Sequence, residues 1–178
     1  MSGVARAVEA VSYGLAALPR VVAALAAVLW MGLVFALSSG TPPELLPPGW
    51  FSSLIHNAGH AGIFGVLALL AARAAGSGPR AQWAGFAIAT LYGVTDEWHQ
   101  SYVPGRTASL IDWITDAIGA AGSLWIVAAV PVDAKIRRRL WLTAAAVLTS
   151  ASLATLLDIR AAPPNPGKQP NPINAPPA

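Results

Sequence analysis

Long apolar segments alternate with short polar segments along most of this chain, in a pattern that is typical of helices crossing a membrane. Five apolar segments are each about 17 to 21 residues long, which is enough for an α-helix to cross about 30 Å of hydrocarbon. They cover residues 21–38, 54–72, 82–100, 110–130 and 140–157. The pattern therefore predicts an all-α, polytopic transmembrane helix bundle of about five spans.

The two ends of the chain depart from this pattern. Residues 4–18 contain one arginine and one glutamate and end before a proline, so the segment 1–20 is expected to include a short interfacial helix at the cytoplasmic side. Residues 158–178 are rich in proline and asparagine and have little to bury, which predicts a disordered tail. The bundle itself is expected to form one domain over residues 21–157.

Composition agrees with a protein of the lipid bilayer. Of the 178 residues, 55% are hydrophobic and only 11% are charged, and the mean hydropathy is +0.56. There is no cysteine, which excludes a disulfide framework, a thiolate metal site and a cysteine nucleophile. The net charge is +3, but the basic residues lie in short loops rather than in a basic and aromatic patch, so a nucleic-acid partner is not expected.

The basic residues predict an orientation. With five crossings, eight of the eleven fall on one side of the membrane: Arg6, Arg20, Arg73, Arg80, Lys135, Arg137, Arg138 and Arg139. Because cytoplasmic loops carry an excess of Lys and Arg, we expect a cytoplasmic N-terminus and an external C-terminus.

Ionisable residues concentrate in one stretch, residues 95–116, which holds four of the eight carboxylates of the chain. Such residues are expensive at membrane depth and usually line a polar cavity or site. In the predicted topology the second, third and fourth spans all bring polar residues to the outer side. Their spacing by four places His56 with His60, Asp96 with Gln100, and Asp112 with Asp116 on common helix faces. We therefore expect them to line an outward-opening cavity.

The connection between the third and fourth spans contains a strong turn signal, Pro104-Gly105. Proline sets the first turn dihedral and glycine accepts a positive second one, which suits a type II turn. This turn is expected to fold Arg106 back toward the carboxylates.

The start of the fourth span also carries local signals. Thr107 or Ser109 is expected to cap the helix, with Asp112 near its positive end. Farther along, Gly119 and Gly122 are interpreted as positions of close helix packing.

The candidate site residues are His60, Asp96, Glu97, Gln100, Arg106, Asp112 and Asp116. Because Asp96 and Glu97 point about 100° apart on a helix, only one of them is expected to face the site directly. One hypothesis is acid-base catalysis at the head group of an envelope lipid, with Arg106 holding a phosphate or carboxylate. A second is binding without chemistry. A third is a structural network, in which Arg106 pairs with a carboxylate and the polar residues only pin the helices together. Whether the protein is an enzyme stays open at this point.

A metal site is a narrower hypothesis. His56 and His60, together with Glu97, His99 or Asp112, have donor types that suit zinc or a similar ion. Spacing alone does not identify a metal or another cofactor, so both stay unknown.

The polar motifs resemble those of the VanZ-like family of membrane proteins. The resemblance lies in Asp96-Glu97-Trp98-His99-Gln100, in Val103-Pro104-Gly105-Arg106, and in Asp112 and Asp116 followed by Gly119 and Gly122; upstream, His60 with Phe64 and the pair Ser38-Ser39 also fit. It covers roughly residues 29–125. The chain departs from the usual pattern where it has His56-Asn57 in place of Arg-Lys, and Asp116 in place of Asn.

The resemblance implies a small polytopic protein of the bacterial cell membrane, in a family named for resistance to glycopeptide antibiotics. It implies no particular reaction. The expected partners are membrane lipid and a lipid-linked or glycopeptide ligand at the outer face.

Overall fold

The computed structural model describes residues 3–40, 50–106 and 108–128, and the short pieces 138–139, 142–150 and 152–153. The molecule is all-helical. Five of its helices are α1 (Gly3–Ala17), α2 (Arg20–Ser38), α3 (Trp50–Ala75), α4 (Pro79–Gln100) and α5 (Leu110–Val127), and residues 142–150 are also helical. The prediction of an all-α bundle is therefore confirmed. The expected tail lies outside the described residues, whereas residues 142–150 and 152–153 of the expected fifth span are described and helical.

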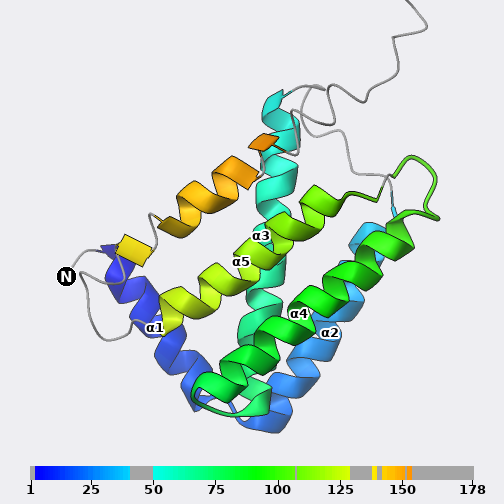
Figure 1. Ribbon diagram of the computed structural model, residues 1–178. Helices are drawn as coiled ribbons and strands as arrows, with labels where there is room; N and C mark the ends of the chain where they lie inside the picture. Colours follow the sequence, from blue (N-terminus) through cyan, green and yellow to red (C-terminus); the bar gives the residue numbers. More distant parts are fainter. Residues whose placement is uncertain are drawn as a thin grey trace, which may run out of the picture.

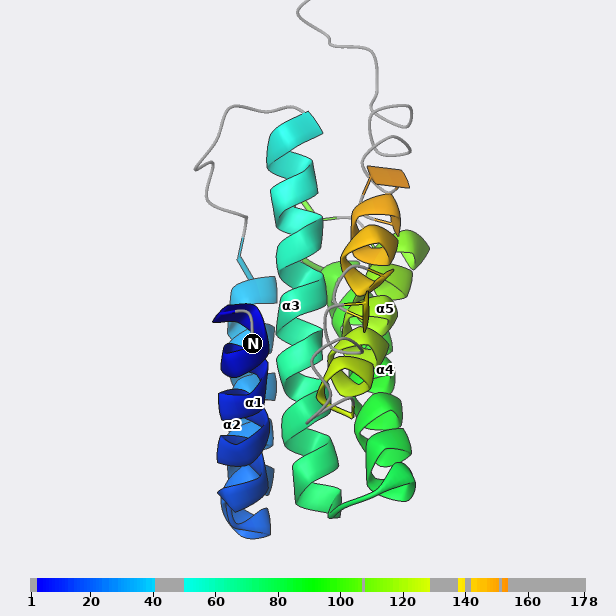
Figure 2. The ribbon, with the colours of Figure 1, turned by 90° about the vertical axis from the view of Figure 1, so that its left-hand side faces the viewer.

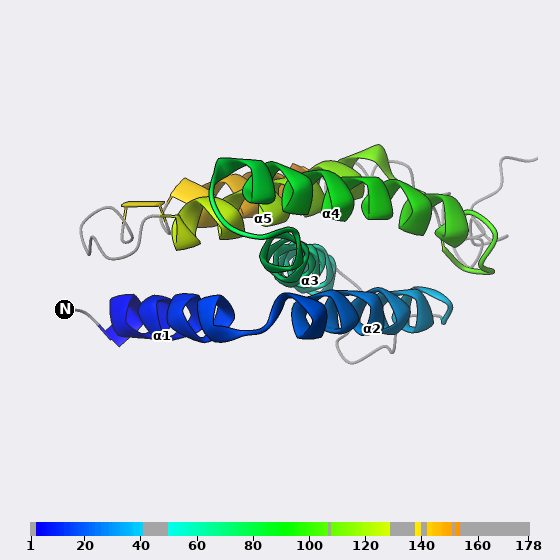
Figure 3. The ribbon, with the colours of Figure 1, turned by 90° about the horizontal axis from the view of Figure 1, so that it is seen from below.

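Helix α3 is the central element of the bundle (Figure 1). It contacts each of the other four helices, whereas α2 does not contact α5. Seen along α3, the helices form layers, with α1 and α2 on one side and α4 and α5 on the other (Figure 3). The view from the side shows α3 between these two layers over most of its length (Figure 2).

Among the described residues, three helices are long and apolar enough to cross a membrane: Arg20–Ser38, Ala58–Ala75 and Leu110–Val127. Their outer faces are also apolar, since Val21, Leu25 and Leu29 of α2 are 60 to 75% exposed, as expected for side chains in contact with lipid. Helix α4 is 22 residues long but is less apolar, because it carries Arg80 and an acidic pair near its end. The predicted count of five spans is not confirmed.

Small residues set how closely the helices approach. A Cβ atom on Gly119 of α5 would overlap the backbone of Ala61 on α3, and a Cβ atom on Gly85 of α4 would overlap the backbone of α3 at Ala68 and Ala72. Without a hydrophobic driving force in lipid, such close backbone contacts are a main source of helix association. The interpretation of Gly119 as a close-packing position is confirmed. Gly122 also meets a neighbour, the side chain of Thr143.

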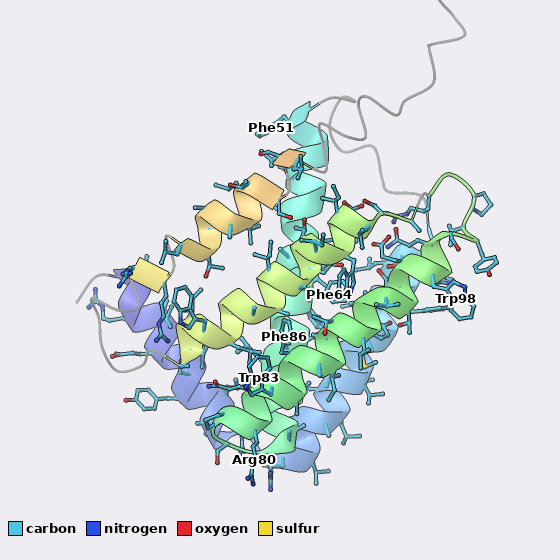
Figure 4. All side chains as sticks on the ribbon, in the orientation of Figure 1. Phe51, Phe64, Arg80, Trp83, Phe86 and Trp98 are labelled. Atoms are coloured by element: carbon cyan, nitrogen blue, oxygen red, sulfur yellow. The ribbon has the colours of Figure 1, made fainter. Side chains whose placement is uncertain are left out.

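The interior between α3, α4 and α5 is built around Phe64, which is 1% exposed and lies within the bundle in Figure 4. Leu67, Ala68 and Ala89 surround it with no exposed surface of their own. In the same view, Arg80 and Trp98 mark opposite ends of α4. The apolar core thus separates two ends of the bundle, one of which carries the acidic stretch.

We predict that Gly119→Ala destabilises the bundle, because the added methyl group meets the Ala61 backbone, which cannot rotate away. Overpacking of this kind costs about 1 to 3 kcal/mol. Gly62→Ala on α3 is the matched control, since nothing lies within 4 Å of a Cβ there. It is expected to stabilise the helix by about 0.5 to 1 kcal/mol. Thermal unfolding of the purified protein in detergent measures both, and equal effects of the two substitutions would contradict the close approach of α3 and α5.

Candidate functional site

The N-terminal halves of α3 and α5 meet the C-terminal end of α4 in a group of buried polar side chains. From α3, the Nδ1 atom of His60 lies 3.7 Å from the Oδ1 atom of Asp116 on α5. The Asp116 side chain is 1% exposed and that of His60 is 15% exposed. Two helices that are distant in sequence are thus joined by an imidazole and a carboxylate in a site that is nearly closed to solvent.

Helix α4 contributes Asp96 and Gln100, which lie one turn apart as their spacing predicted. The Gln100 Nε2 atom donates a hydrogen bond of 2.9 Å to the Oδ2 atom of Asp96. Both residues are buried, with 2% of Asp96 and 5% of Gln100 exposed. The amide therefore satisfies one of the two carboxylate oxygens from within the same helix.

Glu97 is buried as well, with 8% of the residue exposed. Its Oε2 atom accepts a hydrogen bond of 2.7 Å from the backbone N–H of Ser109, the residue that caps α5. The expectation that only one of Asp96 and Glu97 faces the site was wrong. Because α5 begins beside the end of α4, a side chain on that flank of α4 is covered too.

The start of α5 matches its local sequence signals. The Ser109 hydroxyl accepts a hydrogen bond from the backbone N–H of Asp112, which places an acidic residue in the first helical turn. The turn before it is also as predicted, since the N–H of Arg106 donates to the carbonyl of Val103 and Gly105 has a φ of 81°. The chain reversal thus brings α5 back beside α4.

The carboxylates share one electrostatic environment. Asp116, Asp96 and Asp112 all act on the charge of His60, and Glu97 interacts with Asp112 and Asp116 across the α4–α5 contact. Charges this close are weakly screened when they are buried. We call His60, Asp96, Glu97, Gln100, Asp112 and Asp116 the acidic cluster.

Several oxygens of the acidic cluster accept no hydrogen bond from the part of the chain that the structure describes. They are Oδ1 of Asp96, Oε1 of Glu97 and both carboxylate oxygens of Asp116, all of them buried. Leaving such groups unsatisfied costs free energy, more so when they are charged. These atoms therefore have capacity for further hydrogen-bond donors.

Arg106 does not join the carboxylates. Its Nε and Nη2 atoms donate to the backbone carbonyls of Gly40, at 3.1 Å, and Leu37, at 3.3 Å. No ion pair forms between Arg106 and a carboxylate within the described ranges. The predicted approach of Arg106 to the carboxylates was wrong, because the carbonyls at the end of α2 carry the negative end of a helix dipole and lie within reach of the turn.

Sequence reasoning also missed the contribution of α2. Its C-cap residue Ser39 lies with its Oγ atom 3.0 Å from the Nε2 atom of His99 on α4, and the His99 ring stacks on Phe35 at a centroid distance of 4.3 Å. Deeper in the bundle, the Tyr92 hydroxyl donates a 2.6 Å hydrogen bond to the carbonyl of Met31. The pair Ser38-Ser39 was noted in the sequence, but nothing in its spacing indicated a partner on α4.

A cavity of about 420 Å³ lies between α2 and α4 beside these contacts, and we call it the aromatic groove. It is lined by Phe35, Tyr92, Thr95, Asp96, Trp98, His99 and Tyr102. Asp96 belongs to both the aromatic groove and the acidic cluster, so the two are connected through one carboxylate.

The metal hypothesis finds no support in the described part of the chain, where no three His, Asp or Glu side chains are arranged to hold a metal ion. The side chains of His56 and Asn57 lie outside what the structure describes.

The fold and the apolar helices define a polytopic integral membrane protein with buried ionisable groups at one end. A family model described as VanZ/LLP1 matches residues 22–131, which is more than half of the chain. The chain therefore belongs to the VanZ/LLP1 family. Neither a curated protein nor a solved structure matches it.

We predict that Arg106→Gln lowers stability modestly, because it removes a charge at the C-terminal end of α2 and at least one of its two exposed hydrogen bonds. The expected loss is below about 1 kcal/mol, which corresponds to a shift of less than about 2 to 4 °C in the unfolding midpoint. Arg80→Gln is the matched control, since Arg80 lies at the other end of α4 and makes no hydrogen bond within the described residues. Differential scanning fluorimetry compares the two, and an Arg106→Gln protein as stable as Arg80→Gln would contradict the anchoring role.

Proposed function

We propose that this VanZ-family protein binds the polar head of an envelope lipid or a related amphiphile at its acidic cluster. In this proposal the cluster opens to the outer face of a bacterial cell membrane, and lipids or lipid-linked molecules of the outer leaflet are the ligands. A role in the response to glycopeptide antibiotics follows, because those compounds act on lipid-linked precursors at the same surface.

The observation that carries the proposal is the set of buried oxygens on Asp96, Glu97 and Asp116 that have no hydrogen-bond donor among the described residues. A polar network that only held helices together would stabilise the bundle most when all of its polar groups were hydrogen-bonded. Here the helices are already held by close backbone packing at Gly119 and Gly85. Unsatisfied carboxylates in a well-packed bundle support a ligand with several donors.

Acid-base catalysis on the bound head group is the second candidate, and the pair of His60 and Asp116 favours it. A carboxylate 3.7 Å from a ring nitrogen can orient the imidazole and stabilise its protonated form. The other carboxylates would then hold the substrate. Binding and catalysis differ in whether a product appears.

The proposed orientation is supported by the distribution of charge along the bundle. Arg20, Arg73 and Arg80 lie near the start of α2, the end of α3 and the start of α4, which form the end opposite the acidic cluster. By the excess of basic residues in cytoplasmic loops, this end and the N-terminus face the cytoplasm. The acidic cluster and the C-terminus then face outward.

We predict that Asp116→Asn abolishes lipid binding and that Asp96→Asn weakens it, in both cases without loss of stability. Each substitution removes a buried charge and keeps the shape of the side chain. The unfolding midpoint is therefore expected to stay the same or to rise, because residues that form a binding site often lower the folding stability. Native mass spectrometry after incubation with a bacterial total lipid extract measures the retained lipid. Glu9→Gln on α1 is the control and should retain it. If both cluster variants retain lipid and unfold earlier, the cluster is structural.

The same variants separate binding from catalysis and test the antibiotic link. Mass analysis of the incubated lipids reveals any product, and His60→Ala should stop its formation if His60 transfers the proton.

Expression of the intact protein in a susceptible bacterium is expected to raise the inhibitory concentration of a glycopeptide antibiotic at least two-fold, and Asp116→Asn is expected to remove this protection. No change on expression of the intact protein would contradict the antibiotic link.

We predict that a thiol at position 101 is accessible from outside the cell and one at position 77 is not. The chain has no native cysteine, so Ser77→Cys and Ser101→Cys each give a single, exposed label site. Serines are preferable to the neighbouring Gly78 and Gly105, whose φ values of 80° and 81° disfavour side chains. Treatment of intact cells with a membrane-impermeant maleimide shows which of the two positions is accessible from outside. Labelling at position 77 but not at position 101 would contradict the proposed orientation.

A further inference from the structure

The aromatic groove combines many rings with a single carboxylate. Five of its seven lining residues carry aromatic or imidazole rings, and Thr95 and Asp96 complete the lining. Phe35 comes from α2, while the other ring-bearing residues come from α4 and the turn that follows it. The groove therefore lies between two helices rather than within one helix surface.

The rings are arranged in two pairs. Phe35 stacks on His99 with centroids 4.3 Å apart, and Trp98 meets Tyr102 edge to face with centroids 5.9 Å apart. The Nε1 atom of Trp98 donates a hydrogen bond of 3.2 Å to the Tyr102 hydroxyl, which fixes the second pair. Phe35, Trp98 and Tyr102 are 51 to 72% exposed, so each of them keeps accessible surface beyond its ring partner.

Exposed Trp and Tyr residues near a helix end also occur in the interfacial belts of membrane proteins. A belt accounts for the rings, but it does not account for the carboxylate beside them. Asp96 is only 2% exposed and lines the groove, and its Oδ1 atom accepts no hydrogen bond within the described residues. A buried acceptor at an aromatic surface indicates a ligand that is both a cation and a hydrogen-bond donor.

The charge of the surrounding residues also favours a cationic ligand. The acidic cluster holds four carboxylates and one imidazole, while the nearest guanidinium, that of Arg106, is engaged by the carbonyls at the end of α2. Anionic groups are therefore disfavoured here, and a cation is attracted by the cluster as well as by the ring faces. An N–H ammonium satisfies both kinds of contact, because it can donate to Asp96 while its methylene groups lie against the rings.

We propose that the aromatic groove binds the primary ammonium group of a membrane lipid, as in an ethanolamine head group. A volume of about 420 Å³ accommodates a head group but not a whole lipid. The acyl chains would stay in the bilayer beside α2, whose outer face is apolar and exposed. A lipid is the expected source because the groove lies between α2 and α4, and the outer face of α2 is apolar and exposed.

The ammonium site rests on the proposed function, because Asp96 belongs to both the groove and the acidic cluster. It goes further in naming the charge of the head group and the rings that recognise it. Thr95 and Tyr102 line the groove but are not members of the cluster, so substitutions there test the groove alone.

The test is a fluorescence titration of the intact protein in nanodiscs of phosphatidylglycerol. Dihexanoyl phosphatidylethanolamine, dihexanoyl phosphatidylglycerol and free ethanolamine are the three probes. The signal of Trp98 is isolated by subtracting the same titration of a Trp98→Phe protein, since the chain has seven tryptophans. We expect saturable binding of the ethanolamine lipid at least ten-fold tighter than that of the glycerol lipid or of free ethanolamine.

Three variants refine the result. Asp96→Asn is expected to reduce the preference for the ethanolamine lipid about ten-fold, which corresponds to about 1.4 kcal/mol. Thr95→Trp should fill the groove and abolish the signal. Tyr102→Leu should weaken binding several-fold, whereas substitution of Tyr13 on α1, which is also largely exposed, by Leu should not.

Equal affinity for the two lipids, or an unchanged preference in Asp96→Asn, would overturn the ammonium site. Free ethanolamine binding as tightly as the lipid would overturn the assignment to a membrane lipid. These failures are distinct from failure of the proposed function. If Asp116→Asn abolishes lipid retention while Thr95→Trp retains it, the cluster binds a head group and the groove does not. If Asp116→Asn has no effect on retention, the proposed function itself is wrong.

Discussion

The contact between Ala61 of α3 and Gly119 of α5 is the constraint on which the site depends. Because Gly119 has no side chain, the backbones of the two helices meet there directly. His60 is the neighbour of Ala61 in sequence, and Asp116 lies about one turn before Gly119, so the same contact that joins the helices also brings the imidazole to the carboxylate. Apolar side chains gain little free energy when they move from lipid into a contact between helices. The packing of α3 with α5 therefore depends on the complementary shapes of the two helices. The polar site is therefore a direct consequence of a steric fit.

That fit explains how the bundle tolerates buried carboxylates. Groups such as Asp96 and Asp116 disfavour folding when their oxygens lack donors, and the close backbone packing of α3 with α4 and α5 offsets this effect. A protein under selection for stability alone would replace them with apolar side chains of similar volume. The proposed head group would supply the donors that these oxygens lack within the described residues.

Local features of the site could be predicted from the sequence because they depend on neighbours in the chain. The Pro104-Gly105 turn, the Ser109 cap and the hydrogen bond between Asp96 and Gln100 each involve residues within four positions of one another. The role of Gly119 was predicted because small residues let helices approach closely in lipid, although Gly62 shows that a helical glycine need not lie at such a contact.

The partners of Arg106 and His99 could not be predicted, because they lie on α2, more than fifty residues earlier in the sequence. Spacing indicates which face of a helix a residue occupies, but not which helix covers that face. Charge complementarity suggested a carboxylate for Arg106, whereas the structure places the unpaired carbonyls of a helix end nearer. Burial of both Asp96 and Glu97 was missed for the same reason, since it requires helices on two flanks of α4.

The two sides of α4 differ in how its neighbours are held, and this difference bears on where a ligand can enter. Toward α3, the contact at Gly85 is between backbones and leaves no space. Toward α2, the contacts that define the groove are made by the ends of side chains, at His99 with Ser39 and at Tyr92 with the Met31 carbonyl. Side chains can change rotamer on a far shorter timescale than packed helices can separate. A head group can therefore be admitted between α2 and α4 by side-chain motion alone, and would reach Asp96 without any change in the packing that holds His60 against Asp116.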